Sequence, residues 1–135
     1  MAGKVVLVTG AWGGLGKTFI RHLLASHAKI ILSEIVADLN TPEGPQALYD
    51  ACKKIAPVDM IIHNAGLAFV GHYEEIPREK MNLQMRVMLT APMELTHLFL
   101  PDFLGHLVFI DSVAGFIATK LGTSYSAAKF GLRGF

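Results

Sequence analysis

The sequence is poor in charge and in cysteine, and both scarcities limit what the protein can be. Charged residues make up only 17% of the chain, the formal net charge is +1, and Lys and Arg are scattered rather than clustered. This pattern gives no indication of a nucleic-acid partner. The single cysteine, Cys52, excludes an internal disulfide and is typical of a reducing compartment, so we expect a cytoplasmic protein.

Long hydrophobic runs are also missing, although 52% of the residues are hydrophobic. The apolar runs at 5–8, 29–36, 60–62 and 106–110 have at most eight residues each, which is too short to cross a bilayer. Met1 leads into the first run without the regions of a signal peptide. We therefore expect no membrane association. The apolar content predicts a single domain over residues 1–135 with a buried core.

Short apolar runs alternate with segments of helical periodicity. Continuous β-branched and apolar runs predict buried strands at 4–9, 29–35, 58–63 and 106–111. Helical spacing predicts helices at 17–27, 47–55, 78–100 and 124–135, with the third interrupted or kinked around Pro92. The alternation predicts an α/β fold, a doubly wound parallel sheet of the Rossmann-like type. A mixed α+β domain is the alternative.

One segment does not fit a complete fold of this type. The run at 29–39 is continuous, whereas two neighbouring parallel strands need a crossover of about a dozen residues or more. We interpret the run as one strand. One βα unit is then missing or fused, and the predicted sheet is incomplete.

A glycine-rich turn, TGAWGGLG at 9–16, lies between the first predicted strand and the first predicted helix. Gly10 would allow the tight turn, Gly14 the close approach of a pyrophosphate, and Gly16 the packing of helix against strand. The helix N-terminus would offer free N–H groups to the phosphates. The context predicts a dinucleotide site, and a purely structural turn is the alternative.

Glu34 follows Gly16 by eighteen positions, close to the spacing of the acidic residue that binds the ribose hydroxyls in such sites. A carboxylate accepts hydrogen bonds from these hydroxyls and repels a 2′-phosphate, so we expect NAD and regard NADP as the less favoured cofactor. The alternative is that Glu34 is only an exposed strand end.

A hydroxyl and lysine cluster follows the last predicted strand. Ser112 ends that strand, and Tyr125 and Lys129 are spaced i and i+4, on one face of the last predicted helix. An ammonium near a tyrosine favours the phenolate, which makes the hydroxyl a better proton donor and acceptor at neutral pH. A serine at the carboxyl end of a parallel strand can hydrogen-bond a substrate oxygen. The alternative is a chance spacing, with Ser112 merely capping a strand.

Taken in order, TGAWGGLG, Asn64-Ala65-Gly66 and the spacing S-x12-Y-x-x-x-K resemble the short-chain dehydrogenase/reductase family over essentially the whole chain. The resemblance implies hydride transfer between NAD(P)(H) and a carbonyl or secondary alcohol substrate. It implies that Tyr125 is the general acid/base, that Lys129 tunes it and binds the nicotinamide ribose, and that Ser112 orients the substrate.

The resemblance also extends the predicted cofactor site. It implies that Asp38 contacts the adenine and that the 64–66 turn steadies the sheet and lines the cofactor. His63, where a second Asn is common in the family, is interpreted as a strand-end residue. The complete set of predicted cofactor contacts is Gly10, Trp12, Gly14, Leu15, Gly16, Glu34, Asp38, Leu39, Asn64, Ala65, Gly66, Tyr125 and Lys129, with no metal ligand.

Three departures from the family leave a second hypothesis open. Glu34 and Asp38 are only four positions apart, although in the family such residues end successive strands. Met88 stands where the family usually has an Asn of the proton relay, and it cannot replace the amide. The chain ends at Phe135, before the family's later strands, which leads us to expect a fragment or a short form. The alternative to an enzyme is therefore a non-catalytic nucleotide-binding or interaction module. A homo-oligomer through the long helix and the last one is a further expectation.

Overall fold

The computed structural model describes residues 1–32 and 37–135. Its centre is a sheet of four parallel strands in the order β2-β1-β3-β4. The strands are β1 (Val5–Val8), β2 (Lys29–Leu32), β3 (Met60–His63) and β4 (His106–Phe109). The register pairs Leu7 with Ile31 on one side and with Ile61 on the other. The predicted α/β fold with a parallel sheet is confirmed.

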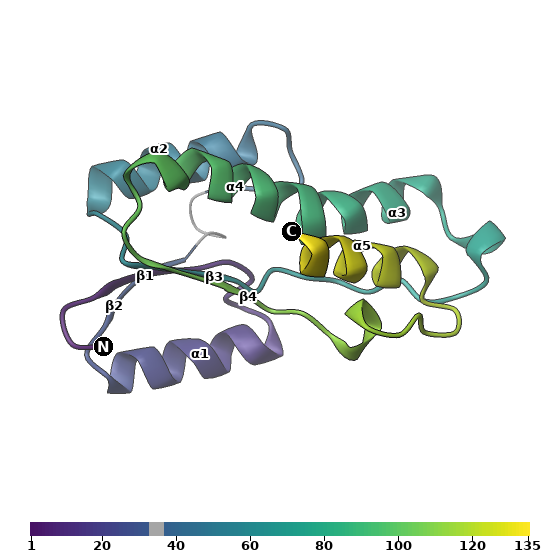
Figure 1. Cartoon of the computed structure of the whole chain (residues 1–135), viewed down its shortest axis with the longest axis horizontal. Coiled ribbons are helices and arrows are strands. Elements are labelled where there is room, and N and C mark those ends of the chain that lie inside the picture. Colours follow the sequence, from purple (N-terminus) through teal and green to yellow (C-terminus); the bar gives the residue numbers. More distant parts are fainter. Residues whose placement is uncertain (33–36) are drawn as a thin grey trace.

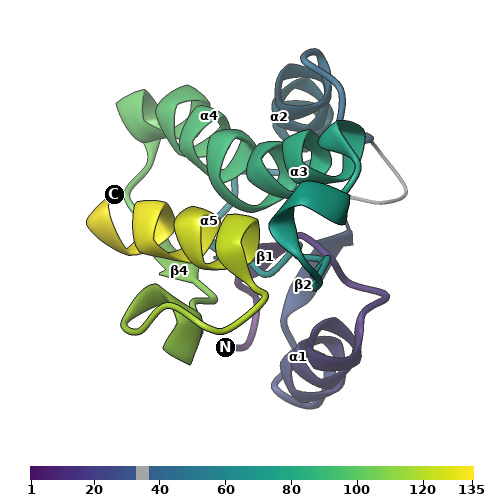
Figure 2. The ribbon, with the colours of Figure 1, turned by 90° about the vertical axis from the view of Figure 1, so that its right-hand side faces the viewer.

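Helices cover both faces of this sheet (Figure 1, Figure 2). They are α1 (Gly14–Ala25), α2 (Gly44–Ile55), α3 (Arg78–Met85), α4 (Ala91–Phe99) and α5 (Thr123–Gly134). Figure 2 shows α1 on one side of the strands and the other four helices on the opposite side. The described residues therefore form three layers, with a single helix, α1, in one of them.

Alternate residues of the strands build two separate cores. Val5, Leu7 and Ile61 point toward α2 and α4 and pack with Leu48 and Leu95. Cys52 is buried in this layer, and burial raises the pKa of its thiol to about 11. On the other face, side chains from β1, β3 and α1 pack together; the buried ones are Val6, Val8, Ala11, Leu23, Ala28 and Ile62. Apolar residues on both faces explain why the strand sequences are continuous rather than alternating.

The long helix predicted over 78–100 is interrupted, as expected near Pro92, but by a π-helical segment, Arg86–Thr90, that joins α3 to α4. Proline has no N–H to donate to the carbonyl of Met88 four residues earlier, so the regular α-helical ladder cannot continue there. The interruption therefore begins several residues before the proline itself.

The interpretation of residues 29–39 as one strand is wrong at its end. β2 covers Lys29–Leu32, and Ala37 and Asp38 lie outside any strand, in the segment that leads to α2. Glu34 lies outside the described residues. β2 is an edge of the described sheet, and no further strand stands between it and α2 in the described chain, as expected if one βα unit is missing. Across residues 1–32 and 37–135, none of the helices has the length and apolar character needed to cross a membrane.

Candidate functional site

The glycine-rich turn begins with a residue that only glycine suits. Gly10 has φ of +66°, in the left-handed region, and a Cβ added there would lie 2.6 Å from the Cα of Ala65. A side chain at this position would be strained and would also overlap the backbone of the neighbouring turn. Gly10 thus lets the end of β1 lie directly against the end of β3.

The other two predicted glycines differ from each other. A Cβ on Gly16 would lie 2.6 Å from the carbonyl oxygen of Ala11, so the first turn of α1 packs tightly onto the loop. A Cβ on Gly14 would meet no atom within 4 Å. Gly14 is the first residue of α1, where backbone N–H groups have no intrahelical acceptor. The fold thus requires Gly10 and Gly16, whereas the space at Gly14 is open to a ligand.

A hydrogen-bond network joins this turn to the Asn64-Ala65-Gly66 turn. The Asn64 side-chain amide donates to the carbonyls of Thr9 (2.9 Å) and Gly10 (2.8 Å). The Thr9 hydroxyl oxygen accepts from the backbone N–H groups of Asn64 and Ala65, both at 3.0 Å. Thr9 is buried and was not among the predicted site residues. The sequence feature that could have identified Thr9 is its position at the end of the strand, directly before Gly10.

The remaining predicted cofactor residues vary in exposure. Trp12 and Leu15, within the glycine-rich turn, are 59% and 60% exposed. Leu39 is buried in the core, which leaves only its main chain for the predicted contact. Asp38 is exposed, and one of its carboxylate oxygens accepts from the N–H of Asn40 at 2.9 Å.

The Ser/Tyr/Lys cluster is assembled by α5 and the end of β4. Lys129 is buried, and its ammonium donates to the carbonyl of Ile110 at 2.5 Å, two residues before Ser112. The same Nζ lies 6.0 Å from the centre of the Tyr125 ring. Burial lowers the pKa of Lys129, and the charge of Asp111 acts in the opposite direction. The lysine therefore ties α5, the helix that also carries Tyr125, to the segment that carries the serine.

Ser112 keeps its hydroxyl hydrogen available. Its Oγ accepts from the N–H of Ala114 at 3.2 Å, which uses a lone pair and not the hydrogen. Beside it, Asp111 has a buried carboxylate oxygen, Oδ1, with no hydrogen-bond partner among the residues that the structure describes. The serine hydroxyl can thus donate a hydrogen bond to an oxygen atom of a bound ligand.

A buried polar pair, not anticipated from the sequence, holds the start of α5. Ser124 donates to the side-chain oxygen of Gln84 on α3 at 2.9 Å, and the amide of Gln84 donates to the carbonyl of Leu67 at 3.3 Å. Gln84 is fully buried. A glutamine in an otherwise helical segment carries no distinctive sequence signal. The pair places the residue next to Tyr125 relative to α3.

Met88 and His63 are both buried. Met88 is 1% exposed and lies in the π-helical segment, and its Cγ faces Gly66. His63 ends β3 and stacks on Phe109 with ring centres 4.7 Å apart. Burial lowers the pKa of His63 to about 4, so the ring is neutral at pH 7. Within the described part of the chain, no cluster of His, Cys, Asp and Glu could hold a metal ion.

The family model for short chain dehydrogenases matches residues 33–135, and the chain belongs to this family. It is 30% identical over 163 aligned positions to the human hydroxysteroid 11-beta-dehydrogenase 1-like protein, covering all of this chain and 51% of the relative. It is 28% identical to retinol dehydrogenase 10-A of Danio rerio, again over the whole chain and 55% of the relative. The chain thus spans about half the length of these relatives.

These alignments also bear on the missing unit. The 163 aligned positions exceed the 135 residues of the chain by 28, so at least that many positions of the human relative have no counterpart here. Taken together, 28 positions would suffice for one βα unit.

Two solved structures share the fold over nearly the whole chain. A short chain dehydrogenase from Shigella flexneri superposes with a TM-score of 0.87 at 26% identity, covering 99% of this chain and 65% of that one. A blue fluorescent protein from a metagenomic library, solved in complex with NADPH, also gives 0.87, at 23% identity, covering 98% and 66%. The Rossmann-like architecture is therefore shared with two longer chains of known structure, one of them a short chain dehydrogenase.

Proposed function

We propose that the chain is the nucleotide-binding and catalytic part of an NAD(P)-dependent oxidoreductase that interconverts a carbonyl and a secondary alcohol. One observation carries this proposal: Lys129 reaches from α5 to the carbonyl of Ile110 and so ties the helix that carries Tyr125 to the end of β4, where Ser112 lies. Family membership supports the same reaction class.

The residues at the end of β1 fit a dinucleotide. The space at Gly14, together with the first N–H groups of α1, suits a pyrophosphate, because helix N-termini attract anions. Gly10, Gly16, Asn64, Ala65 and Gly66 fix the shape of this cradle, and Trp12 and Leu15 form its exposed rim. We assign Asp38 and the main chain of Leu39 to the adenine end and Glu34 to the ribose.

The chemistry divides among three side chains. When bound, the nicotinamide supplies or accepts the hydride. In the direction of reduction, the Tyr125 hydroxyl donates a proton to the carbonyl oxygen, and in oxidation it takes that proton back. The Lys129 ammonium stabilises the phenolate and binds the ribose next to the nicotinamide. Ser112 donates a hydrogen bond to the substrate oxygen and holds it in line with the tyrosine.

For the cofactor, we propose NAD rather than NADP, because Glu34 would repel a 2′-phosphate. The structural relative in complex with NADPH shows that the shared architecture accepts a phosphorylated dinucleotide in that protein. We further propose that the protein works in the cytoplasm, on a small carbonyl or alcohol. A homo-oligomer through α4 and α5 would cover the exposed apolar residues Met93 and Phe130.

Met88 favours a second candidate function, a nucleotide-binding module without turnover. The family's asparagine at this position hydrogen-bonds within the proton relay, whereas the methionine is apolar and 1% exposed. A module of this kind would bind the cofactor but would not catalyse the reaction.

A titration with NADH tests both functions. Trp12, the only tryptophan, lies in the glycine-rich turn, so its emission should be quenched as the cofactor binds. The enzyme hypothesis expects saturable quenching and NADH oxidation with a panel of small carbonyls. Binding without turnover would favour the module, and an absence of saturable binding at millimolar NADH would refute both.

A further inference from the structure

We propose that Arg86 is a positioning residue for the adenine end of the dinucleotide, because it holds the turn that carries Asp38. The inference rests on the proposed function. It concerns a side chain on the π-helical segment that lies 45 positions from the turn it contacts.

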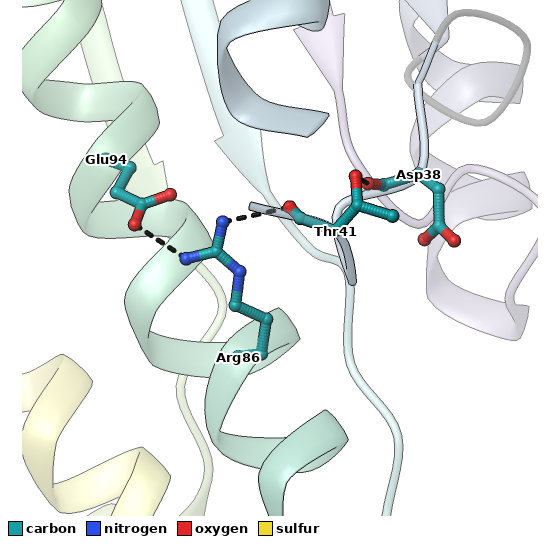
Figure 3. Close-up of polar contacts among 4 residues, drawn as sticks. All are labelled: Asp38, Thr41, Arg86 and Glu94. Atoms are coloured by element: carbon teal, nitrogen blue, oxygen red, sulfur yellow. Dashed lines mark hydrogen bonds and ion pairs between the residues drawn. The ribbon is translucent and has the colours of Figure 1, made fainter. Parts of the chain in front are cut away.

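Arg86 makes two charge-assisted hydrogen bonds with one guanidinium group (Figure 3). Nη1 binds the Oε1 of Glu94 on α4 at 2.6 Å, and Nη2 donates to the backbone carbonyl of Thr41 at 2.9 Å. The Arg86 side chain is only 18% exposed. Two bonds from a rigid planar group fix its position and its orientation, so Glu94 aligns the group that holds Thr41.

Hydrogen bonds connect Thr41 to Asp38, which lies three residues earlier in the chain. The Thr41 hydroxyl and backbone N–H both donate to the carbonyl of Asp38, at 3.0 and 3.2 Å. The N–H of Asn40 donates to the Asp38 carboxylate. In Figure 3 the carboxylate points away from Arg86, so the arginine does not neutralise it. A shift of Thr41 would therefore move Asp38 without changing its charge.

The turn needs such support because it does not continue a strand. Ala37 and Asp38 lie outside the sheet, and β2 is the edge of the described sheet on that side. Hydrogen bonds of a parallel ladder would otherwise fix a residue at a strand end. Here Leu39 anchors the turn in the core, and the Arg86 guanidinium, itself held by Glu94 on α4, fixes the turn from the π-helical segment.

The test compares Arg86→Met with Asp102→Asn. Methionine keeps the apolar stem and removes both hydrogen bonds, whereas Asp102 forms a 3.4 Å ion pair with Lys53 that is exposed and outside the proposed site. Calorimetric titration uses ADP-ribose, which contains the adenine end without the nicotinamide. We expect Arg86→Met to raise the Kd for ADP-ribose roughly tenfold, as for the loss of charged hydrogen bonds, and Asp102→Asn to leave it unchanged.

Hydrogen exchange separates positioning from general stability. In Arg86→Met the amides of Asn40 and Thr41 should exchange faster, while those of β1 should not. Ile61→Val, a small deletion in the core on β3, serves as a control for stability. If Arg86→Met binds ADP-ribose as the parent does, the inference is overturned. It is also overturned if Arg86→Met and Ile61→Val weaken ADP-ribose binding in proportion to the Tm that each variant loses.

If Arg86→Met does not fold, a second variant, Glu94→Gln, tests the inference. Glu94→Gln keeps an oxygen acceptor but removes the charge, and should weaken ADP-ribose binding about threefold; unchanged affinity overturns the inference. If the parent chain itself does not bind ADP-ribose, the proposed function fails and the inference with it. Binding by the parent with no effect of either variant contradicts the inference alone.

Discussion

The two halves of the proposed site are built in different ways. The cradle at the end of β1 is made of backbone: Gly10 against Ala65, Gly16 against Ala11, and carbonyls held by Asn64. The reactive cluster is made of side chains from α5 and from the end of β4, with Lys129 reaching from the first to the second. The cradle depends on residues that are small, and the reactive cluster depends on side chains that contact another element.

This difference decides where each half is vulnerable. A cradle of backbone fails when an atom is added, because packed backbone cannot move aside. A cluster of side chains fails when an atom is removed, because each functional group has its own role. The following changes test this contrast.

Removal of one oxygen from the cluster should have the largest effect. Tyr125→Phe should lower kcat by roughly 10²–10⁴, the usual contribution of a general acid/base, with little change in the affinity for NADH. The measurement is steady-state turnover beside the Trp12 fluorescence titration. Tyr73→Phe, at an exposed tyrosine in a short turn, is the matched control. Equal turnover in Tyr125→Phe would remove the tyrosine from the mechanism.

Addition of one methyl group to the cradle should come next. Gly10→Ala should lower the free energy of unfolding by roughly 2–5 kcal/mol, because the new Cβ has both an unfavourable φ and an overlap with Ala65. Gly14→Ala meets open space, so it should leave the unfolding midpoint nearly unchanged and weaken NADH binding instead. Chemical denaturation and the NADH titration together check the pair. The same loss of stability in both variants would contradict the division of roles between these glycines.

The stability of the protein should depend on pH through His63, which ends β3 and stacks on Phe109 of β4. Burial lowers the pKa of His63 from 6.5 to about 4, so between these values the unfolded chain binds a proton that the folded chain does not. The contribution to stability is present above pH 6.5 and is lost as the pH falls to 4, by up to about 3 kcal/mol. His63→Asn should flatten this part of the stability curve relative to the parent. His72→Asn, at an exposed histidine, should leave it unchanged.

The smallest expected effect concerns Met88, which stands where the family usually has an Asn of the proton relay. Met88→Asn should raise kcat severalfold by restoring an amide where the family has one. It should also lower the free energy of unfolding by about 1–3 kcal/mol, because the position is 1% exposed. Met93→Asn, at an exposed methionine on α4, controls for the change of side chain. A kcat that does not rise in Met88→Asn would mean that this position does not limit proton transfer.

Much of the fold could be predicted because its signals are local. The continuous apolar runs predicted all four strands, and the glycine spacing predicted the turn at Gly10 and Gly14, since both depend on neighbours in the chain. The supports of the site were not predicted. Thr9, Gln84 and Arg86 hold Ala65, Leu67 and Thr41, which lie 56, 17 and 45 positions away, and nothing in their immediate surroundings identifies those partners.

By itself, the sequence determined the class of fold and the glycine-rich turn, and it predicted the cluster of Ser112, Tyr125 and Lys129, because spacing along one strand or helix sets which residues share a face. Only the tertiary structure decided how the two halves are held. The bond from Lys129 to Ile110, the tie of Asn64 to Thr9 and the contact of Arg86 with Thr41 all join separate elements. Such contacts depend on how helices and strands pack, and packing is a property of the whole chain.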